Sequence, residues 1–237
     1  MENDRKKRVR ENIWSLMEEN NLARFPRPVF GRVPNFVGAR EAALTISESP
    51  EYLEAECIFT NPDAPQQPFR KNALKDGKTL ILATPGIREG FLELDPSTIG
   101  KKALRTASTI KGSFKEGNPV HPSELQIDLF MAGSVGVTTT GGRLGKGKGY
   151  TDLEYGLLKD YDAFSRECIV TTVHEVQILE NIPMGPHDLP VDIIATPRRI
   201  IRTDTTFPRP DGIRWELLSE KRINRIPLLQ ELKDQEA

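Results

Sequence analysis

Residues 141–152, with the sequence GGRLGKGKGYTD, combine five glycines with two lysines and an arginine and end on an aspartate. Glycine lacks a Cβ and lets backbone N–H groups approach an anion closely, while the cationic side chains add positive charge. The alternative is a flexible hairpin turn with solvated lysines. Three cations on so short a segment (Arg143, Lys146 and Lys148) favour the first interpretation, a phosphate-binding loop.

The loop fits neither of the two best-known phosphate fingerprints. A Walker loop needs a serine or threonine after its lysine, and Gly149 stands there. A dinucleotide loop needs G-x-G-x-x-G, whereas Gly145, Gly147 and Gly149 are spaced by two. A different kind of phosphate loop is therefore expected.

The segments around the loop predict how it is positioned. An apolar strand precedes it, and Thr151 followed by Glu154 predicts a capping box that opens a helix over 151–164. A helix N-terminus favours an anion. Asp152 is explained by the helix dipole alone, or by magnesium ligation beside a phosphate. The helix should bury Leu153, Leu157, Leu158, Tyr161 and Phe164.

The wider pattern predicts an α/β domain with a largely parallel sheet. An amphipathic basic helix is expected over 4–20, and further helices over 40–47 and 100–109 and in a short segment ending at Gly77. The core occupies about 55–202 of a single domain spanning 1–237, and an extension over 203–237 is expected to pack back on it. Buried strands are expected within 55–60, 78–84, 125–137, 167–179 and 191–201.

Composition restricts the class of protein. The 33 Lys and Arg residues against 34 Asp and Glu give a net charge of −1, which does not indicate nucleic acid or an anionic membrane as partner. No apolar run reaches the ~20 residues of a membrane span, so we expect a cytoplasmic protein. Cys57 and Cys168 lack the spacing of a disulfide framework or a zinc site. The oligomeric state is left open, with a monomer as the working expectation.

RLGKGKGYTD resembles the signature of the 5-formyltetrahydrofolate cyclo-ligase (methenyltetrahydrofolate synthetase) family, Arg-Leu-Gly-x-Gly-x-Gly-Tyr-x-Asp. Lys6 and Arg10, the late acidic turn HDLPVD and Gln177 resemble further family features, so the resemblance covers most of residues 5–200. The segments VPNF, NPDAP and IPMGPHDLPVDIIATP are similar to a divergent branch, the methenyltetrahydrofolate synthetase domain-containing proteins.

The resemblance implies a three-layer fold similar to the NagB/RpiA/CoA-transferase-like fold. It also implies ATP and Mg²⁺ as cofactors and a reduced folate as partner. The reaction would convert 5-formyltetrahydrofolate and ATP to 5,10-methenyltetrahydrofolate, ADP and phosphate. Positioning and charge neutralisation dominate the catalysis of phosphoryl transfer, which suits such a loop.

The resemblance also assigns roles to individual residues. Without it, Lys6 and Arg10 would be interpreted as a solvated helix face. Catalytic roles fall to Arg143 and Lys148, and magnesium ligation to Asp152 and Asp188. The folate would lie against Lys148, Gly149 and Tyr150. ATP would be bound by Lys6, Arg10, Arg143, Leu144, Gly145, Lys146, Gly147, Lys148, Gly149, Tyr150 and Thr151.

One family feature has no direct counterpart. Family enzymes carry a folate-contacting glutamate after the first core strand, where this chain has Pro65, so Asp63 is the candidate substrate residue. Two alternatives therefore stay open: a nucleotide-binding protein with an RNA-related or folate-sensing role, and a ligase for another substrate. His174 and His187 are interpreted as structural, and Asp192 lies outside the expected site.

Overall fold

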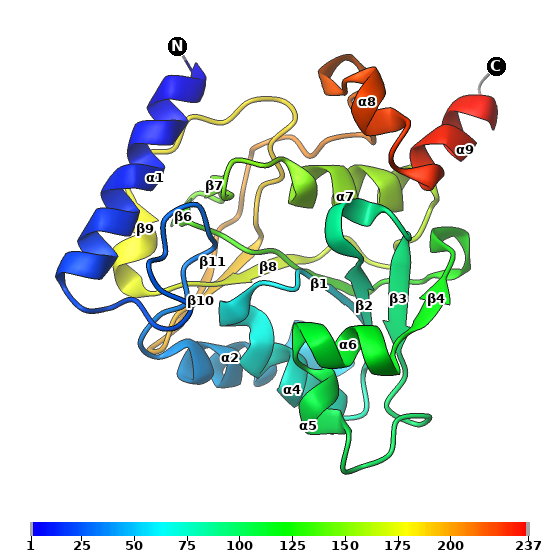
Figure 1. The fold of residues 1–237 in the computed structure, drawn as a ribbon. Helices are drawn as coiled ribbons and strands as arrows, with labels where there is room; N and C mark the ends of the chain where they lie inside the picture. Colours follow the sequence, from blue (N-terminus) through cyan, green and yellow to red (C-terminus); the bar gives the residue numbers. More distant parts are fainter. Residues whose placement is uncertain (1, 236–237) are drawn as a thin grey trace.

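An eight-stranded sheet forms the centre of the computed structural model, which describes residues 2–235 (Figure 1). Its order is β11-β10-β8-β5-β1-β2-β3-β4, and the neighbours from β10 to β2 pair in parallel. Strand β11 at one edge, and β3 and β4 at the other end of the sheet, pair antiparallel with their neighbours. The strands are β1 (Cys57–Thr60), β2 (Thr79–Ala83), β3 (Phe91–Leu94), β4 (Asn118–Val120), β5 (Leu129–Met131), β8 (Ile169–Thr172), β10 (Ile193–Ala195) and β11 (Ile200–Arg202).

Helices cover both faces of this sheet, as the apolar character of its parallel strands requires. In Figure 1, α7 lies above the sheet, while α2 and α4 lie below it. Each face has its own apolar core, one containing α7 residues and the other α2 and α4 residues. These helices are α2 (Ala39–Ser47), α3 (Pro50–Glu54), α4 (Gln67–Lys75), α5 (Leu104–Ala107), α6 (Ile110–Glu116) and α7 (Tyr150–Asp160). The predicted α/β fold with a largely parallel sheet is confirmed.

A small second sheet carries the glycine loop. Its order is β7-β6-β9, formed by β7 (Arg143–Leu144), β6 (Gly136–Thr138) and β9 (Ile178–Leu179). Helix α1 (Glu2–Glu19) buries Ile13, Trp14 and Met17 in a third apolar cluster beside it. Among the helices of residues 2–235, none is long and apolar enough to cross a membrane.

The C-terminal extension packs on the apolar core that contains α7. It contains α8 (Glu220–Ile223) and α9 (Pro227–Gln235), which lie above α7 in Figure 1. Ile223, Leu228, Leu229 and Leu232 from these helices are buried in the same cluster as α7. Burial of these apolar side chains holds the extension against the apolar core that contains α7.

Several predicted boundaries differ from the structure. The helix expected over 100–109 is a single turn, α5, followed by α6. The apolar runs 125–137 and 167–179 each divide into two strands that belong to different sheets. Strands β3 and β4 were not predicted. Strand β3 pairs with β2, and β4 pairs with β3 at the edge of the sheet, so both depend on neighbours in the fold rather than on a local pattern.

Gly141, at the entrance to the glycine loop, should not tolerate a side chain. Its φ is +94°, and an added Cβ would lie 2.5 Å from Thr205 Cβ and 2.9 Å from the Val191 carbonyl oxygen. We therefore expect Gly141→Ala to lower the free energy of unfolding in urea by about 2 to 4 kcal/mol. Gly100→Ala is the matched control, because that position has open space around it. Equal stability of the two variants would contradict this account.

Candidate functional site

A cavity of about 590 Å³, here called the main cavity, opens at the carboxyl ends of β1 and β2. In α/β sheets ligands bind at this edge. Its walls come from α1, the segments after β1 and β2, the glycine loop with the start of α7, and the segment around Asp188. The structure brings every predicted site residue to this one cavity: Lys6, Arg10, Asp63, residues 143–152 and Asp188.

The glycine loop runs from β7 to the first turn of α7 and needs its glycines. Gly147 and Gly149 have φ values of +88° and +60°, which side-chain-bearing residues rarely adopt. A Cβ on Gly147 would also lie 3.2 Å from Arg10 Cζ. Arg10 donates from Nε to the Gly145 carbonyl oxygen at 2.7 Å. The absence of side chains at these positions therefore lets the Arg10 side chain of α1 pack against the loop backbone.

Among the described residues, three lysine or arginine side chains form ion pairs with aspartates in the main cavity. Lys6 Nζ pairs with Asp188 Oδ2. Arg143 Nη2 pairs with Asp152 Oδ1 at 2.5 Å, and Lys146 Nζ pairs with Asp63 Oδ1 at 2.6 Å. Lys6 and Arg143 are only 4% and 2% exposed, so the solvated-face interpretation of α1 does not hold for Lys6. Buried charges of this kind require partners.

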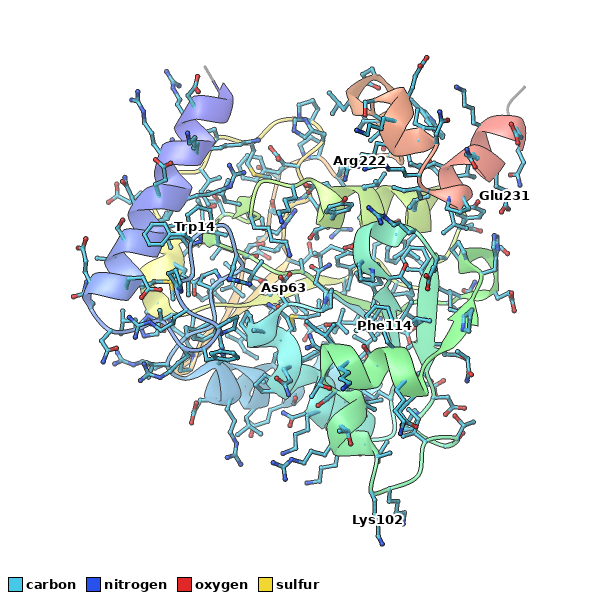
Figure 2. The ribbon with its side chains drawn as sticks, in the orientation of Figure 1. Trp14, Asp63, Lys102, Phe114, Arg222 and Glu231 are labelled. Atoms are coloured by element: carbon cyan, nitrogen blue, oxygen red, sulfur yellow. The ribbon has the colours of Figure 1, made fainter. Side chains whose placement is uncertain are left out.

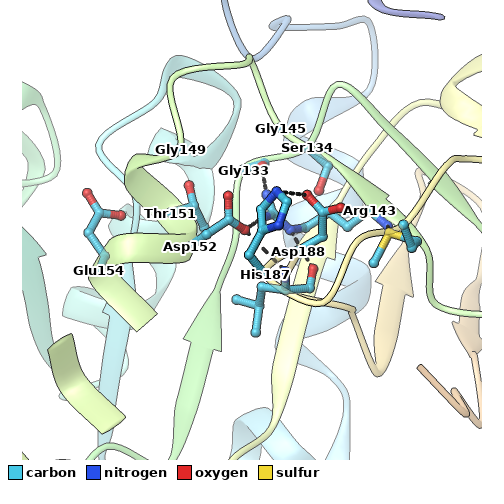
Figure 3. Close-up of polar contacts among 12 residues, drawn as sticks. Gly133, Ser134, Arg143, Gly145, Gly149, Thr151, Asp152, Glu154, His187 and Asp188 are labelled. Atoms are coloured by element: carbon cyan, nitrogen blue, oxygen red, sulfur yellow. Dashed lines mark hydrogen bonds and ion pairs between the residues drawn. The ribbon is translucent and has the colours of Figure 1, made fainter. Parts of the chain in front are cut away.

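Arg143 connects four segments of the chain. Besides Asp152, its guanidinium donates to the Leu189 carbonyl oxygen at 2.9 Å and the Gly133 carbonyl oxygen at 3.1 Å. Figure 3 shows Arg143 and Asp152 beside Asp188 and His187. Leu189 N donates to the same Asp152 oxygen at 3.1 Å. Arg143 thus fixes where the Asp152 carboxylate lies.

Asp152 and Asp188 present a donor set that fits magnesium. Each uses one oxygen for the protein contacts above, and Gly185 N also donates to Asp188 Oδ2 at 2.6 Å. Within residues 2–235, Asp152 Oδ2 accepts no hydrogen bond. Magnesium binds hard oxygen donors and commonly takes only one or two carboxylates together with phosphate oxygens. No group of three or more His, Cys, Asp or Glu is placed to hold a metal among the described residues.

The predicted capping box is wrong. Gly149, in the left-handed conformation, is the N-cap of α7, and the helix begins at Tyr150. Thr151 and Glu154 instead bind Asn61, the residue after β1: Thr151 Oγ1 donates to Asn61 Oδ1 at 3.2 Å, and Asn61 Nδ2 donates to Glu154 Oε2 at 2.6 Å. Asn61 Oδ1 also accepts from Gly133 N at 2.8 Å. A tertiary partner replaces the local cap.

Glu154 is a site residue that the sequence interpretation missed. It lines the main cavity and is 5% exposed, and Figure 3 shows it leaving α7 in a different direction from Asp152. Burial, with the negative charge of Asp63, raises the pKa of Glu154 to about 8, against the opposing effect of Lys146. The carboxyl is therefore largely protonated at neutral pH and can donate a hydrogen bond. The helical pattern around Glu154 did not indicate that its side chain is buried in a cavity.

Asp63 is held in place by a buried arginine. Arg70 donates to the carbonyl oxygens of Asn61 and Asp63 at 2.8 and 3.1 Å, and burial lowers the pKa of Arg70 to about 10. Pro65 is buried in the short 3-10 helix Ala64–Gln66. Among the described residues that line the main cavity, Asp63 is the carboxylate in the segment after β1, and Glu154 adds a carboxyl group from α7.

The two histidines and Asp192, which the sequence analysis placed outside the catalytic roles, differ in their position relative to the main cavity. His174 caps the 3-10 helix Glu175–Gln177, where its Nδ1 accepts from Val176 N at 3.3 Å. Asp192 pairs with Arg209 at 2.5 Å, away from the main cavity. His187, interpreted as structural, does line the cavity, and its Nε2 lies 3.8 Å from Asp188 Oδ1.

Fold and site define an α/β protein with a charged, glycine-lined cavity at the carboxyl edge of its sheet. Residues 2–197 match the 5-formyltetrahydrofolate cyclo-ligase family. The chain belongs to this family, as the resemblance of the glycine loop indicated.

Curated relatives agree with the divergent branch. Methenyltetrahydrofolate synthase domain-containing proteins of Bos taurus and Homo sapiens are 41% and 38% identical to the chain over 238 residues. Each alignment covers 98% of this chain and 62% of the relative, so the chain spans less than two thirds of their length. Among solved structures, a 5,10-methenyltetrahydrofolate synthetase of Aquifex aeolicus is similar, with a TM-score of 0.53 at 19% identity. That match covers 84% of this chain and 93% of the other and supports the fold.

The raised pKa of Glu154 predicts a pH-dependent stability. The folded state holds this proton more tightly than the unfolded chain, whose value is 4.5. The stabilisation is fully present below that value and is lost as pH rises through about 8. Between about pH 5 and pH 9, the free energy of unfolding of the parent chain, measured by urea titration, should fall by an amount on the order of a few kcal/mol. Glu154→Gln should not show this fall, because glutamine does not titrate. Exposed Glu124→Gln should keep the parent profile, and a parent-like profile for Glu154→Gln would contradict the assignment.

Proposed function

We propose that the chain is an ATP- and Mg²⁺-dependent cyclo-ligase that converts 5-formyltetrahydrofolate to 5,10-methenyltetrahydrofolate, with release of ADP and phosphate. One observation carries the proposal: the glycine loop and α1 gather cations around a single cavity at the carboxyl edge of a parallel sheet. Membership of the cyclo-ligase family supports the reaction class.

The charge of the main cavity suits a triphosphate. Its lining contains six cationic side chains and four carboxyl groups, one of which is the protonated Glu154. The loop also presents glycine backbone where a phosphate can approach closely. We assign the ATP phosphates to the backbone of residues 145–149 and to the side chains of Lys6, Arg10, Lys146 and Lys148. Lys6 and Lys146 would exchange their carboxylate partners for phosphate oxygens.

Asp152 and Asp188 would hold magnesium at the phosphates. Bound there, the ion would neutralise negative charge on the phosphate oxygens. Arg143 keeps the Asp152 carboxylate in place through the buried ion pair. We therefore assign Arg143 a positioning role in addition to the charge that it contributes to the cavity.

The folate is assigned to the wall formed by Lys148, Gly149 and Tyr150. Lys148 is exposed at the mouth of the cavity, and Tyr150 is half-buried. The protonated carboxyl of Glu154 is an acid group that the family position at Pro65 lacks. With Asp63, it offers polar partners to the substrate in the same cavity. Transfer of the ATP γ-phosphoryl group to the formyl oxygen would release ADP. The neighbouring folate nitrogen outside the pterin ring would then attack the formyl carbon and lose its proton, which closes the new ring as the formyl oxygen leaves in the phosphate.

Turnover tests the proposal directly. Purified protein with 5-formyltetrahydrofolate, ATP and Mg²⁺ should produce the methenyl absorbance together with an equal amount of ADP. If ATP raises the melting temperature but no product forms beside an active control enzyme, the chain binds nucleotide without cyclo-ligase activity. Failure of both measurements would overturn the nucleotide site as well.

The loop lysines should each contribute to ATP affinity. Lys146→Ala and Lys148→Ala should each weaken ATP binding by roughly 1 to 3 kcal/mol, because each removes a charged hydrogen-bond donor. Isothermal titration calorimetry measures this, with exposed Lys71→Ala on α4 as the control. Arg143→Ala should also weaken ATP binding, and it should destabilise the fold because Arg143 is buried. Unchanged affinity in both lysine variants would show that the loop does not contact the phosphates.

A further inference from the structure

A second cavity, here called the basic cavity, lies between the glycine loop and α8. Its volume is about 390 Å³. Its cationic lining comes from the turn after β2, the glycine loop and the C-terminal extension, and no Asp or Glu of the described residues lines it. The cationic residues are Arg88, Lys148, Lys221, Arg222 and Arg225.

As far as the described residues show, the cations of the basic cavity have no carboxylate partners, unlike three cations of the main cavity. Lys6, Arg143 and Lys146 each form an ion pair. In the part of the chain that the structure describes, no ion pair joins any of the five basic-cavity cations to a carboxylate. Like charges gathered without counter-ions repel one another, and the chain as a whole has a net charge of only −1. The concentration of positive charge is therefore local and is suited to an anion.

Arg222 connects the basic cavity to the glycine loop. Its Nη2 donates to the Gly149 carbonyl oxygen at 3.1 Å, and its guanidinium lies over the Tyr150 ring at 4.6 Å. Its Nε is buried and has no hydrogen-bond acceptor among residues 2–235. Figure 2 shows Arg222 on the upper side of the molecule, where α8 lies above α7.

The two cavities share a wall made of Gly86, Lys148 and Tyr150. A molecule bound on the Tyr150 side of the main cavity can therefore extend past Lys148 into the basic cavity. Three of the five cations lie after residue 197, beyond the segment that matches the family. The C-terminal extension thus adds a charged compartment to the family's site.

We propose that the basic cavity binds the carboxylate-bearing tail of the substrate whose ring system lies in the main cavity. This inference rests on the proposed function, because 5-formyltetrahydrofolate ends in a glutamate with two carboxylates. Arginine and lysine bind carboxylates through charged hydrogen bonds, and arginine can do so with two parallel bonds. A tail with additional glutamates would contact more of the five cations.

The test compares 5-formyltetrahydrofolate with 5-formyltetrahydropteroate, which lacks the glutamate, by calorimetric titration. The parent chain should bind the tail-bearing compound at least about tenfold more tightly, the value expected for one or two charged hydrogen bonds. Lys221→Ser combined with Arg225→Ser should bring the two affinities to about the same value. Both residues are exposed, so the double variant should fold.

Lys101→Ser combined with Lys102→Ser is the matched control. These lysines are also exposed, and Figure 2 shows Lys102 at the opposite end of the molecule from Arg222. The control should keep the preference of the parent. Equal affinities in the parent, or a preference retained in Lys221→Ser with Arg225→Ser, would overturn the proposal. Loss of ATP affinity in that variant without loss of the preference would also overturn it, because the cavity would then serve the nucleotide.

Failure of the proposed function can be distinguished from failure of this inference. If neither pterin binds the parent, the cyclo-ligase proposal fails, and a tri-glutamate peptide then probes the basic cavity alone. Peptide binding that the double variant loses and the control keeps would support a carboxylate site. Absence of peptide binding to the parent would overturn it.

Discussion

The glycine loop keeps its shape because arginine side chains from three different elements hold its backbone. A segment with five glycines in twelve residues has few side chains of its own to fix it. Arg143 anchors its start, Arg10 of α1 binds the Gly145 carbonyl oxygen, and Arg222 of the C-terminal extension binds the Gly149 carbonyl oxygen. The two ends of the chain therefore meet on one loop in the middle of the sequence.

This arrangement couples folding to site formation. Burial lowers the pKa of Arg10, while the negative charges of Asp188 and Asp152 raise it, so these carboxylates lie close enough to affect α1. The buried Lys6–Asp188 and Arg143–Asp152 pairs then fix α1 and α7 around the cavity. Breaking a buried pair by removing one partner leaves an unpaired charge, which is costly. The cations are thus in place before a ligand arrives, at the cost of carboxylates that a ligand must displace or share.

The sequence predicts the elements of the fold better than the contacts of the site. Apolar runs identify the buried parallel strands, and the glycine loop identifies the family through its own residues. Glu154 was assigned to a capping box because it follows Thr151 by three positions, yet Asn61 at the end of β1 binds both side chains. That contact joins residues 93 positions apart and leaves no local pattern. The role of Arg222 could not be predicted from the sequence either, because its contact with the glycine loop depends on where the C-terminal extension packs.

We expect the phosphates of ATP to bind inside the arginine-held loop. A crystal structure with Mg²⁺ and a non-hydrolysable ATP analogue would test this. Phosphate oxygens should lie within hydrogen-bond distance of Lys6, Arg10 and the backbone N–H groups of residues 145–149, with the metal at Asp152 and Asp188. A nucleotide bound elsewhere, with the Lys6–Asp188 and Lys146–Asp63 pairs intact and the main cavity empty, would contradict it.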